Sequence, residues 1–241
     1  MSQLSPKPIP ARERLILALD VGSPEEARRL VEALGDHVGF YKIGLALFMC
    51  GGYFELLQWL TDRGKKVFVD LKFFDVPQTV AGAVAKLRGR QVSFATVHGN
   101  EAILKAACAE KGDTKILGVT VLTSMDRNDL IDLGFPEAID IRALVLSRAR
   151  RALAAGCDGV VASGLEAVEL RNELGTRLMI VVPGIRPFDN VDDQKRTVDV
   201  EQAFRNGADY IVVGRPILNA TSPTAAAEKV QERIAAFFAN A

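Results

Sequence analysis

Two aspartates and a lysine follow an apolar run within residues 67–79, whose sequence is VFVDLKFFDVPQT. Residues i and i+2 of a β-strand face the same side, which predicts that Asp70 and Lys72 point together. Asp75 follows just past the predicted strand end, and Pro77 suits the first turn of a helix. Because the apolar run indicates a buried strand, these charges must be paired or functional. The segment therefore predicts either a structural ion pair or an active site.

Lys42, in the segment Tyr-Lys-Ile-Gly, adds a second ammonium group to this set. A pair of unlike charges about 4 Å apart contributes about 4 kcal/mol at an effective dielectric constant of 20. Groups of alternating sign suit a reaction that creates negative charge on carbon, because Lys72 can stabilise that charge and then donate a proton. A metal held by carboxylates is the alternative, although two lysines would compete with the cation; the carboxylates are Asp20, Asp70 and Asp75.

Short apolar runs alternate with helix-like segments along the chain. The predicted strands are residues 15–20, 39–43, 67–71, 92–97, 115–121, 159–162, 178–182 and 210–213. The predicted helices are residues 24–34, 53–62, 77–87, 101–111, 140–155, 165–174, 200–206 and 223–238. Such alternation indicates parallel strands joined by right-handed crossovers. Eight units predict one α/β domain, a (β/α)8 TIM barrel over residues 1–241 with a polar N-terminal extension at residues 1–13.

A doubly wound open sheet is the competing fold. It would require a glycine-rich dinucleotide-binding turn after an early strand, and residues 20–23, Asp-Val-Gly-Ser, are not such a turn. A barrel further predicts that functional residues lie at the carboxyl ends of its strands. The candidates at those positions are Asp20, Lys42, Asp70, Lys72, His98, Thr123, Arg186, Gly214 and Arg215.

Gly214 and Arg215 end the eighth predicted strand, where barrels of this kind commonly bind phosphate. Glycine permits close approach of the backbone to an anion, and arginine supplies a forked cation. The loop after the seventh strand adds Arg186 and Gln194 and is long enough to act as a lid. A simple turn is the structural alternative, but barrel position and residue type both favour phosphate.

The composition excludes several classes of function. Lysine plus arginine and aspartate plus glutamate both number 30, so no net charge would attract nucleic acid or an anionic membrane. No apolar run reaches the ~18 residues of a membrane span, and the polar start is not a signal peptide. The three cysteines lie outside any CxxC motif, which argues against zinc and predicts buried free thiols at Cys50, Cys108 and Cys157. These features predict a soluble, cytoplasmic protein.

Several motifs together resemble the bacterial-type orotidine 5′-phosphate decarboxylase family. They are Asp70-x-Lys72-x-x-Asp75-x-Pro77, Lys42 in Lys-Ile-Gly, Pro183-Gly184-Ile185-Arg186 and Gly214-Arg215-Pro216. The resemblance covers residues 15–215, and its Asp-x-Lys-x-x-Asp core is shared with sister decarboxylases and synthases. The rival interpretations are therefore a metal-dependent sugar-phosphate decarboxylase or aldol-type synthase on the same barrel, and a non-catalytic phosphate-binding barrel.

The resemblance implies a cofactor-free decarboxylation of orotidine 5′-monophosphate to uridine 5′-monophosphate in pyrimidine biosynthesis. In this interpretation Lys72 protonates the ring carbon, Asp70 lies against the departing carboxylate, and Lys42 and Asp75 complete the charged network. The substrate-binding residues would be Asp20 and Lys42 at the ribose hydroxyls, Thr123 at the pyrimidine edge with Ser124 as its competitor, and Gln194, Gly214, Arg215 and Arg186 at the phosphate.

The resemblance also implies a homodimer in which Asp75 and Thr79 reach the active site of the neighbouring subunit. The sequence departs from the family pattern at Phe74, where many relatives have histidine, and at Gln78, where they have asparagine. The run of residues 98–101 also lacks the small residues often found there. We expect the change at Phe74 to tune activity rather than abolish it.

Overall fold

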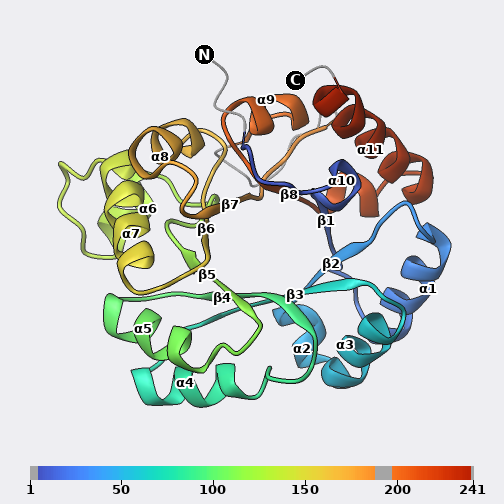
Figure 1. Ribbon diagram of the computed structural model, residues 1–241, viewed down its shortest axis with the longest axis horizontal. Coiled ribbons are helices and arrows are strands. Elements are labelled where there is room, and N and C mark those ends of the chain that lie inside the picture. The colour runs from blue at the N-terminus through green and yellow to red at the C-terminus, as the bar shows by residue number, and fades with distance from the viewer. Residues whose placement is uncertain (1–4, 188–196, 240–241) are drawn as a thin grey trace.

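The computed structural model describes residues 5–187 and 197–239, which form a closed barrel of eight parallel strands in chain order (Figure 1). The strands are β1 (Leu15–Ala18), β2 (Phe40–Gly44), β3 (Lys66–Phe73), β4 (Val92–Val97), β5 (Lys115–Val119), β6 (Gly159–Val161), β7 (Met179–Val182) and β8 (Tyr210–Val213). Pairing of β1 with β8 closes the sheet, with Leu17 opposite Val213. This confirms the predicted TIM barrel and excludes the open sheet.

Helices surround the barrel, both in the connections between the strands and after the last strand (Figure 1). They are α1 (Pro24–Leu34), α2 (Leu45–Met49), α3 (Tyr53–Asp62), α4 (Pro77–Ala85), α5 (Glu101–Glu110), α6 (Arg127–Asp132), α7 (Ile141–Ala154), α8 (Ala167–Leu174), α9 (Val200–Arg205), α10 (Arg215–Leu218) and α11 (Pro223–Ala239), with a 3-10 turn at η1 (Ala11–Glu13). The predicted start of α1 is confirmed, because the Ser23 side chain accepts a hydrogen bond from the Glu26 N–H and Pro24 occupies the first turn.

Three short helices that were not predicted, α2, α6 and α10, lie in the segments that follow strands. Their four to six residues carry too little periodicity to be recognised. The predicted third strand was also too short, because β3 continues beyond Leu71 to Phe73. As a result, Asp70 and Lys72 both lie inside the strand rather than at its predicted end.

The apolar core has two parts, one between the strands and the helices and one inside the barrel. Aromatic rings dominate the inner core, where Phe94 lies with its ring centre 5.1 Å from both Phe40 and Tyr210. These rings are buried and fill the barrel interior, so that the barrel is not an open pore. They form the floor on which the polar groups of the next layer rest.

Part of the predicted N-terminal extension is fastened to the barrel by the buried carboxylate of Asp209, just before β8. The carboxylate accepts hydrogen bonds from the Ser5 hydroxyl and from Lys7 Nζ at 3.2 Å. It also pairs with Arg171 of α8 and accepts the Ile180 N–H at 2.8 Å. Burial of one carboxylate among several donors therefore joins the first described residues to β7, β8 and α8.

The prediction of three buried thiols was partly wrong. Cys157 is buried, Cys108 is partly buried and Cys50 is exposed beside the short helix α2. Cys108 Sγ lies 3.7 Å from Cys157 Sγ, and both are free thiols. Among the described residues, no helix combines the length and the apolar character that a membrane crossing requires.

Candidate active site

Three strands repeat one pattern, an aromatic residue followed two positions later by a polar one. The pairs are Phe40 and Lys42 on β2, Phe68 and Asp70 on β3, and Phe94 and Thr96 on β4. The rings belong to the inner core, and period-two alternation directs the residue two positions later to the same interior side. The polar residues are each nearer the carboxyl ends of the strands. A polar layer therefore covers the aromatic floor at the mouth of the barrel.

The Asp70 carboxylate is the centre of this layer. Lys72 Nζ donates to its two oxygens at 2.9 and 3.0 Å, and Lys42 Nζ lies 3.5 Å from Oδ2. Lys42 Nζ also donates to Asp20 Oδ1 at 3.0 Å. The chain of groups Asp20, Lys42, Asp70, Lys72 thus alternates in sign within one subunit, with Asp20 at the end of the chain where Asp75 was predicted.

Thr96 completes the first shell of Asp70 and was not recognised from the sequence. Its hydroxyl donates to Asp70 Oδ1 at 2.8 Å and accepts the backbone N–H of Lys72 at 2.9 Å. The side chain is 1% exposed. A threonine in an apolar strand carries no chemical signal by itself, but the shared spacing after Phe94 is a signal that could have identified it.

Lys72 has a left-handed backbone conformation, with φ of 48°. The pairing register between β3 and β4 shifts at this point, between Val69 and Phe73. The pleated alternation used to predict a common direction for Asp70 and Lys72 therefore does not hold at Lys72 itself. The two side chains nevertheless meet, because the irregular backbone is held by the Thr96 hydroxyl. Backbone strain of this kind is common where a functional side chain must be aimed.

Charge compensation keeps Asp70 ionised in spite of its burial. Burial by itself would raise the pKa of the carboxyl, but Lys42, Lys72 and the Thr96 hydroxyl together hold that pKa below its ordinary value. Only 12% of the side chain is exposed, and the Lys42 side chain is exposed to the same extent. The site therefore holds a fixed negative charge between two fixed positive charges.

A cavity of about 310 Å³ opens beside this chain of charges. Lys42, Asp70 and Lys72 line one side, and Thr123 and Ser124 line another. The remaining wall is apolar and includes Phe68, Val119, Val121, Leu122, Val161, Pro183 and Val212. Thr123 is buried whereas Ser124 is exposed, so both hydroxyl residues predicted from the sequence lie at the cavity at different depths. The cavity suits a flat, partly polar ring placed against the charged groups.

Asp75 and Thr79 do not join this cavity within one subunit. Both residues are exposed, and Asp75 Oδ1 accepts the backbone N–H of Val76 at 2.6 Å. Asp20, Asp70 and Asp75 therefore do not converge, and the described residues contain no group of three or more His, Cys, Asp or Glu side chains arranged to hold a metal.

The residues predicted to bind phosphate are placed around the rim of the barrel. Gly214 precedes α10 and lies close to Asp20. A Cβ atom added to this glycine would lie 3.7 Å from Asp20 Oδ2. Arg215 begins α10 and lines a neighbouring hollow together with Asp20. Arg186 follows a bridge between Ile185 and Val198 and is partly buried. Gln194 lies outside the described residues.

His98 and Phe74 pack together at the rim. Their ring centres lie 5.3 Å apart, and Phe74 is 67% exposed. The Nδ1 atom of His98 is buried and has no hydrogen-bond partner in the described part of the chain. Burial, and then the charges of Arg148 and Lys72, lower the pKa of His98. Phe74, which departs from the family pattern, thus contacts His98 and does not line the cavity that holds Lys42, Asp70 and Lys72.

A closed parallel barrel with a charged, partly buried cavity at the carboxyl ends of its strands has the architecture of a TIM-barrel enzyme. Comparison with known proteins narrows this class. Residues 13–230 match the sequence model described as "Orotidine 5'-phosphate decarboxylase / HUMPS family". The chain belongs to this family.

Curated relatives and solved structures agree with the assignment. The chain is 62% identical over 238 residues to a protein of Methylococcus capsulatus named orotidine 5'-phosphate decarboxylase, with 98% of each chain covered. It is 53% identical to a protein of the same name from Xanthomonas euvesicatoria, with 96% of each chain covered. The crystal structure of orotidine 5'-phosphate decarboxylase from Lactobacillus acidophilus matches with a TM-score of 0.81 and 33% identity, over 92% of this chain and 99% of that one.

Proposed function

We propose that this chain decarboxylates orotidine 5′-monophosphate to uridine 5′-monophosphate, a carboxy-lyase reaction of pyrimidine biosynthesis. Family membership and the names of its relatives support this reaction. The structural observation that carries the proposal is the contact of Lys72 Nζ with both oxygens of Asp70, beside a cavity whose opposite wall is largely apolar. A proton donor is thereby fixed next to a buried carboxylate.

In the proposed mechanism Asp70 acts on the substrate carboxylate and Lys72 acts on the ring carbon. The substrate carboxylate lies against Asp70, and repulsion between the two carboxylates favours loss of carbon dioxide. The bond between the ring carbon and the carboxylate breaks, the electron pair stays on the ring carbon, and carbon dioxide leaves. Lys72 stabilises the resulting carbanion and transfers a proton from Nζ to that carbon. No cofactor takes part in the proposed sequence.

Preorganised charge must supply much of the rate enhancement. Enzymes lower barriers by roughly 8–23 kcal/mol, and a carbanion without an electron sink lies at the high end of this range. Asp20, Lys42, Asp70 and Lys72 form a continuous chain of contacts. The site therefore needs little rearrangement of its charged groups during the reaction.

The remaining substrate groups are proposed to contact residues around the cavity. Asp20 and Lys42 would hold the ribose hydroxyls, and Thr123 would contact the pyrimidine edge. Gly214, Arg215, Arg186 and Gln194 would hold the phosphate. Their place beside β7 and β8 supports this role for the first three, because barrels of this type commonly bind phosphate there. Binding energy from the phosphate can then be used at the reacting carbon.

We further propose a homodimer in which Asp75 and Thr79 complete the active site of the partner subunit. Both side chains are exposed in the single chain and lie next to exposed apolar residues. Phe74 is 67% exposed, Val76 is 61% exposed, and Met49 on α2 is 78% exposed. Exposed apolar side chains near a site favour a protein–protein contact. The proposal also places the enzyme in a reducing compartment, the cytoplasm, because its cysteines are free thiols.

The decisive experiment incubates the purified protein with orotidine 5′-monophosphate in excess chelator and follows the loss of orotate absorbance. We expect rapid conversion by the wild type and none by Lys72→Ala. Lys66→Ala is the matched control, because Lys66 lies on the same strand but pairs with Glu13 at its opposite end. It should retain full activity.

The alternatives give different results in the same assay. A sister enzyme that depends on a metal would be inactive in chelator and would act on a sugar phosphate when magnesium is restored. A non-catalytic barrel would bind the nucleotide without converting it, and Lys72→Ala would leave that binding unchanged. No conversion under any of these conditions would refute the proposed decarboxylase activity.

A further inference from the structure

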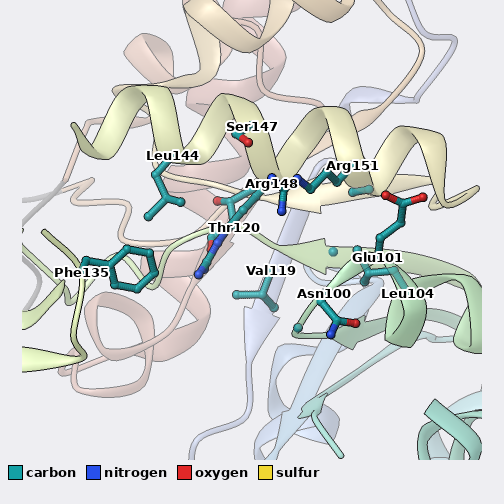
Figure 2. A pocket seen from close by; sticks show the side chains of 13 residues that line it. Asn100, Glu101, Leu104, Val119, Thr120, Phe135, Leu144, Ser147, Arg148 and Arg151 are labelled. Atoms are coloured by element: carbon teal, nitrogen blue, oxygen red, sulfur yellow. The ribbon is translucent and has the colours of Figure 1, made fainter. Parts of the chain in front are cut away.

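A second cavity, of about 280 Å³, lies outside the barrel wall between α5 and α7 (Figure 2). Helix α7 forms one side of the cavity with Leu144, Ser147, Arg148 and Arg151. Figure 2 shows these four side chains on the same helix. The beginning of α5 and the end of β5 form the opposite side. We call this cavity the α5–α7 pocket. Lys42, Asp70 and Lys72 of the barrel mouth do not line it, so the two cavities have different charged groups.

Two guanidinium groups face this pocket. Arg148 Nη1 donates a hydrogen bond to the Thr120 carbonyl, and its guanidinium lies 5.8 Å from the centre of the Phe135 ring. Within residues 5–187 and 197–239, neither Arg148 nor Arg151 forms an ion pair with a carboxylate. Burial lowers the pKa of Arg148, and the charge of Arg151 lowers it further. Two positive charges therefore share one partly enclosed space. They repel each other there, and a bound anion would offset the repulsion.

The acidic residue at the rim, Glu101, offsets only part of this charge, because its carboxylate is attracted by Arg151 but is bound directly by Lys105. Glu101 lines the pocket, and its carboxylate contacts Lys105 at 2.7 Å. The pocket also meets the N-terminus of α5, a helix of ten residues whose cap is Asn100. The positive end of the helix dipole adds to the field of the two arginines. The electrostatic environment is thus suited to an anion.

The rest of the lining combines polar residues with apolar side chains, which suits an anion that carries an apolar group better than a bare inorganic ion. Phe135 and Leu144 lie at one end of the pocket, Val119 lies in the centre, and Leu104 lies at the other end (Figure 2). We propose that the α5–α7 pocket binds a small organic anion whose phosphate or carboxylate group lies between Arg148 and Arg151. The apolar ring or chain of the ligand packs against Phe135 and Leu144.

The pocket is connected to the barrel mouth through the end of β5. Val119 lines both cavities, Arg148 holds the Thr120 carbonyl, and Thr123 lines the mouth three residues further on. An anion that competes for Arg148 weakens its hold on Thr120 and shifts this segment. Occupancy therefore changes the KM for the nucleotide, a consequence that rests on the proposed function.

The direct test is calorimetric titration of the full chain with phenyl phosphate, benzoate, inorganic phosphate and phenol. We expect phenyl phosphate or benzoate to bind with a dissociation constant of about 1 mM or lower, more tightly than the other two probes. Arg151→Met should weaken this binding at least about tenfold. Arg150→Met is the matched control, because Arg150 is exposed on the same helix and pairs with Glu173 instead.

Arg151 is exposed, so its replacement leaves the fold intact, which thermal melting would verify. Binding of equal strength in the wild type and both variants would assign the ligand to another site and overturn the proposal, as would no binding to the wild type. These results do not depend on catalysis. In kinetic assays, the better-binding anion should change the KM of the wild type and Arg150→Met but not of Arg151→Met. An equal rise in all three would instead indicate competition at the barrel mouth and overturn the coupling.

Discussion

The Thr96 hydroxyl joins Asp70 to the backbone of Lys72, donating to Asp70 Oδ1 at 2.8 Å and accepting the Lys72 N–H at 2.9 Å. One neutral side chain thus fixes the carboxylate and the left-handed backbone that directs the lysine. The two charged residues are held relative to one another from the neighbouring strand. The precision of the proposed active site consequently depends on β4 as well as on β3.

Replacement of Thr96 by valine should separate this positioning role from the charges themselves. Valine keeps the shape but removes both hydrogen bonds, so kcat should fall on the order of 10- to 100-fold with a smaller change in KM. The free energy of unfolding should fall by about 1–3 kcal/mol, because the Lys72 N–H loses its partner. Thr96→Ser keeps the hydroxyl and should restore most of kcat. If valine and serine variants had equal kcat, the hydroxyl would have no positioning role.

Sharing of the active site between subunits can be tested with heterodimers of Lys72→Ala and Asp75→Asn subunits, purified through two different tags. Each homodimeric variant should be inactive. If Asp75 acts in the partner's site, the heterodimer has one site with both changes and one intact site, and it should regain about half of the wild-type activity. If Asp75 acts within its own subunit, both sites carry a lesion and the heterodimer should remain inactive.

The buried carboxylate of Asp209 should be important for stability and not for catalysis. Asp209→Asn leaves Arg171 and Lys7 without their charge partner, and the free energy of unfolding in urea should fall by about 3–5 kcal/mol. Glu110→Gln, which breaks the exposed pair with Arg88, should cost at most about 1 kcal/mol. Folded Asp209→Asn should retain the wild-type kcat. A loss as small as that of the surface control would show that the network contributes little.

His98 should make the protein less stable in mild acid. Its pKa in the folded state is lowered by burial and by the charges of Arg148 and Lys72, whereas the pKa of a histidine in the unfolded chain is about 6.5. As the pH falls through that value, the unfolded state takes up a proton that the folded state does not. The free energy of unfolding therefore decreases between about pH 6.5 and the lower pKa of the folded state.

The measurement is urea unfolding of the wild type, His98→Gln and His37→Gln at pH 7.5 and pH 5.5. The difference in stability between the two pH values should be smaller in His98→Gln than in the wild type. His37 is exposed, and its replacement tests whether any histidine would have the same effect. An unchanged pH dependence in His98→Gln would show that other groups control acid stability.

The sequence by itself determined the order of strands and helices and the residues that face the barrel mouth. Apolar runs alternating with helical segments predicted the barrel, because each unit can bury its apolar face only against the next. Spacing of two residues predicted that Asp70 and Lys72 meet, although the structure brings them together through the irregular backbone at Lys72, and position at strand ends grouped them with Lys42 and Asp20. These features depend on local periodicity and connectivity, which the sequence records directly.

Only the tertiary structure decided which groups touch. Pairing of β4 with β3 brought Thr96 against Asp70, and the register shift in that pairing lies where Lys72 has its unusual backbone. Packing of α7 against α5 created the pocket that Arg148 and Arg151 share. Hydrogen-bond partners and enclosed spaces arise between segments far apart in the chain. Their geometry depends on strand stagger and helix packing, which no local pattern of residues encodes.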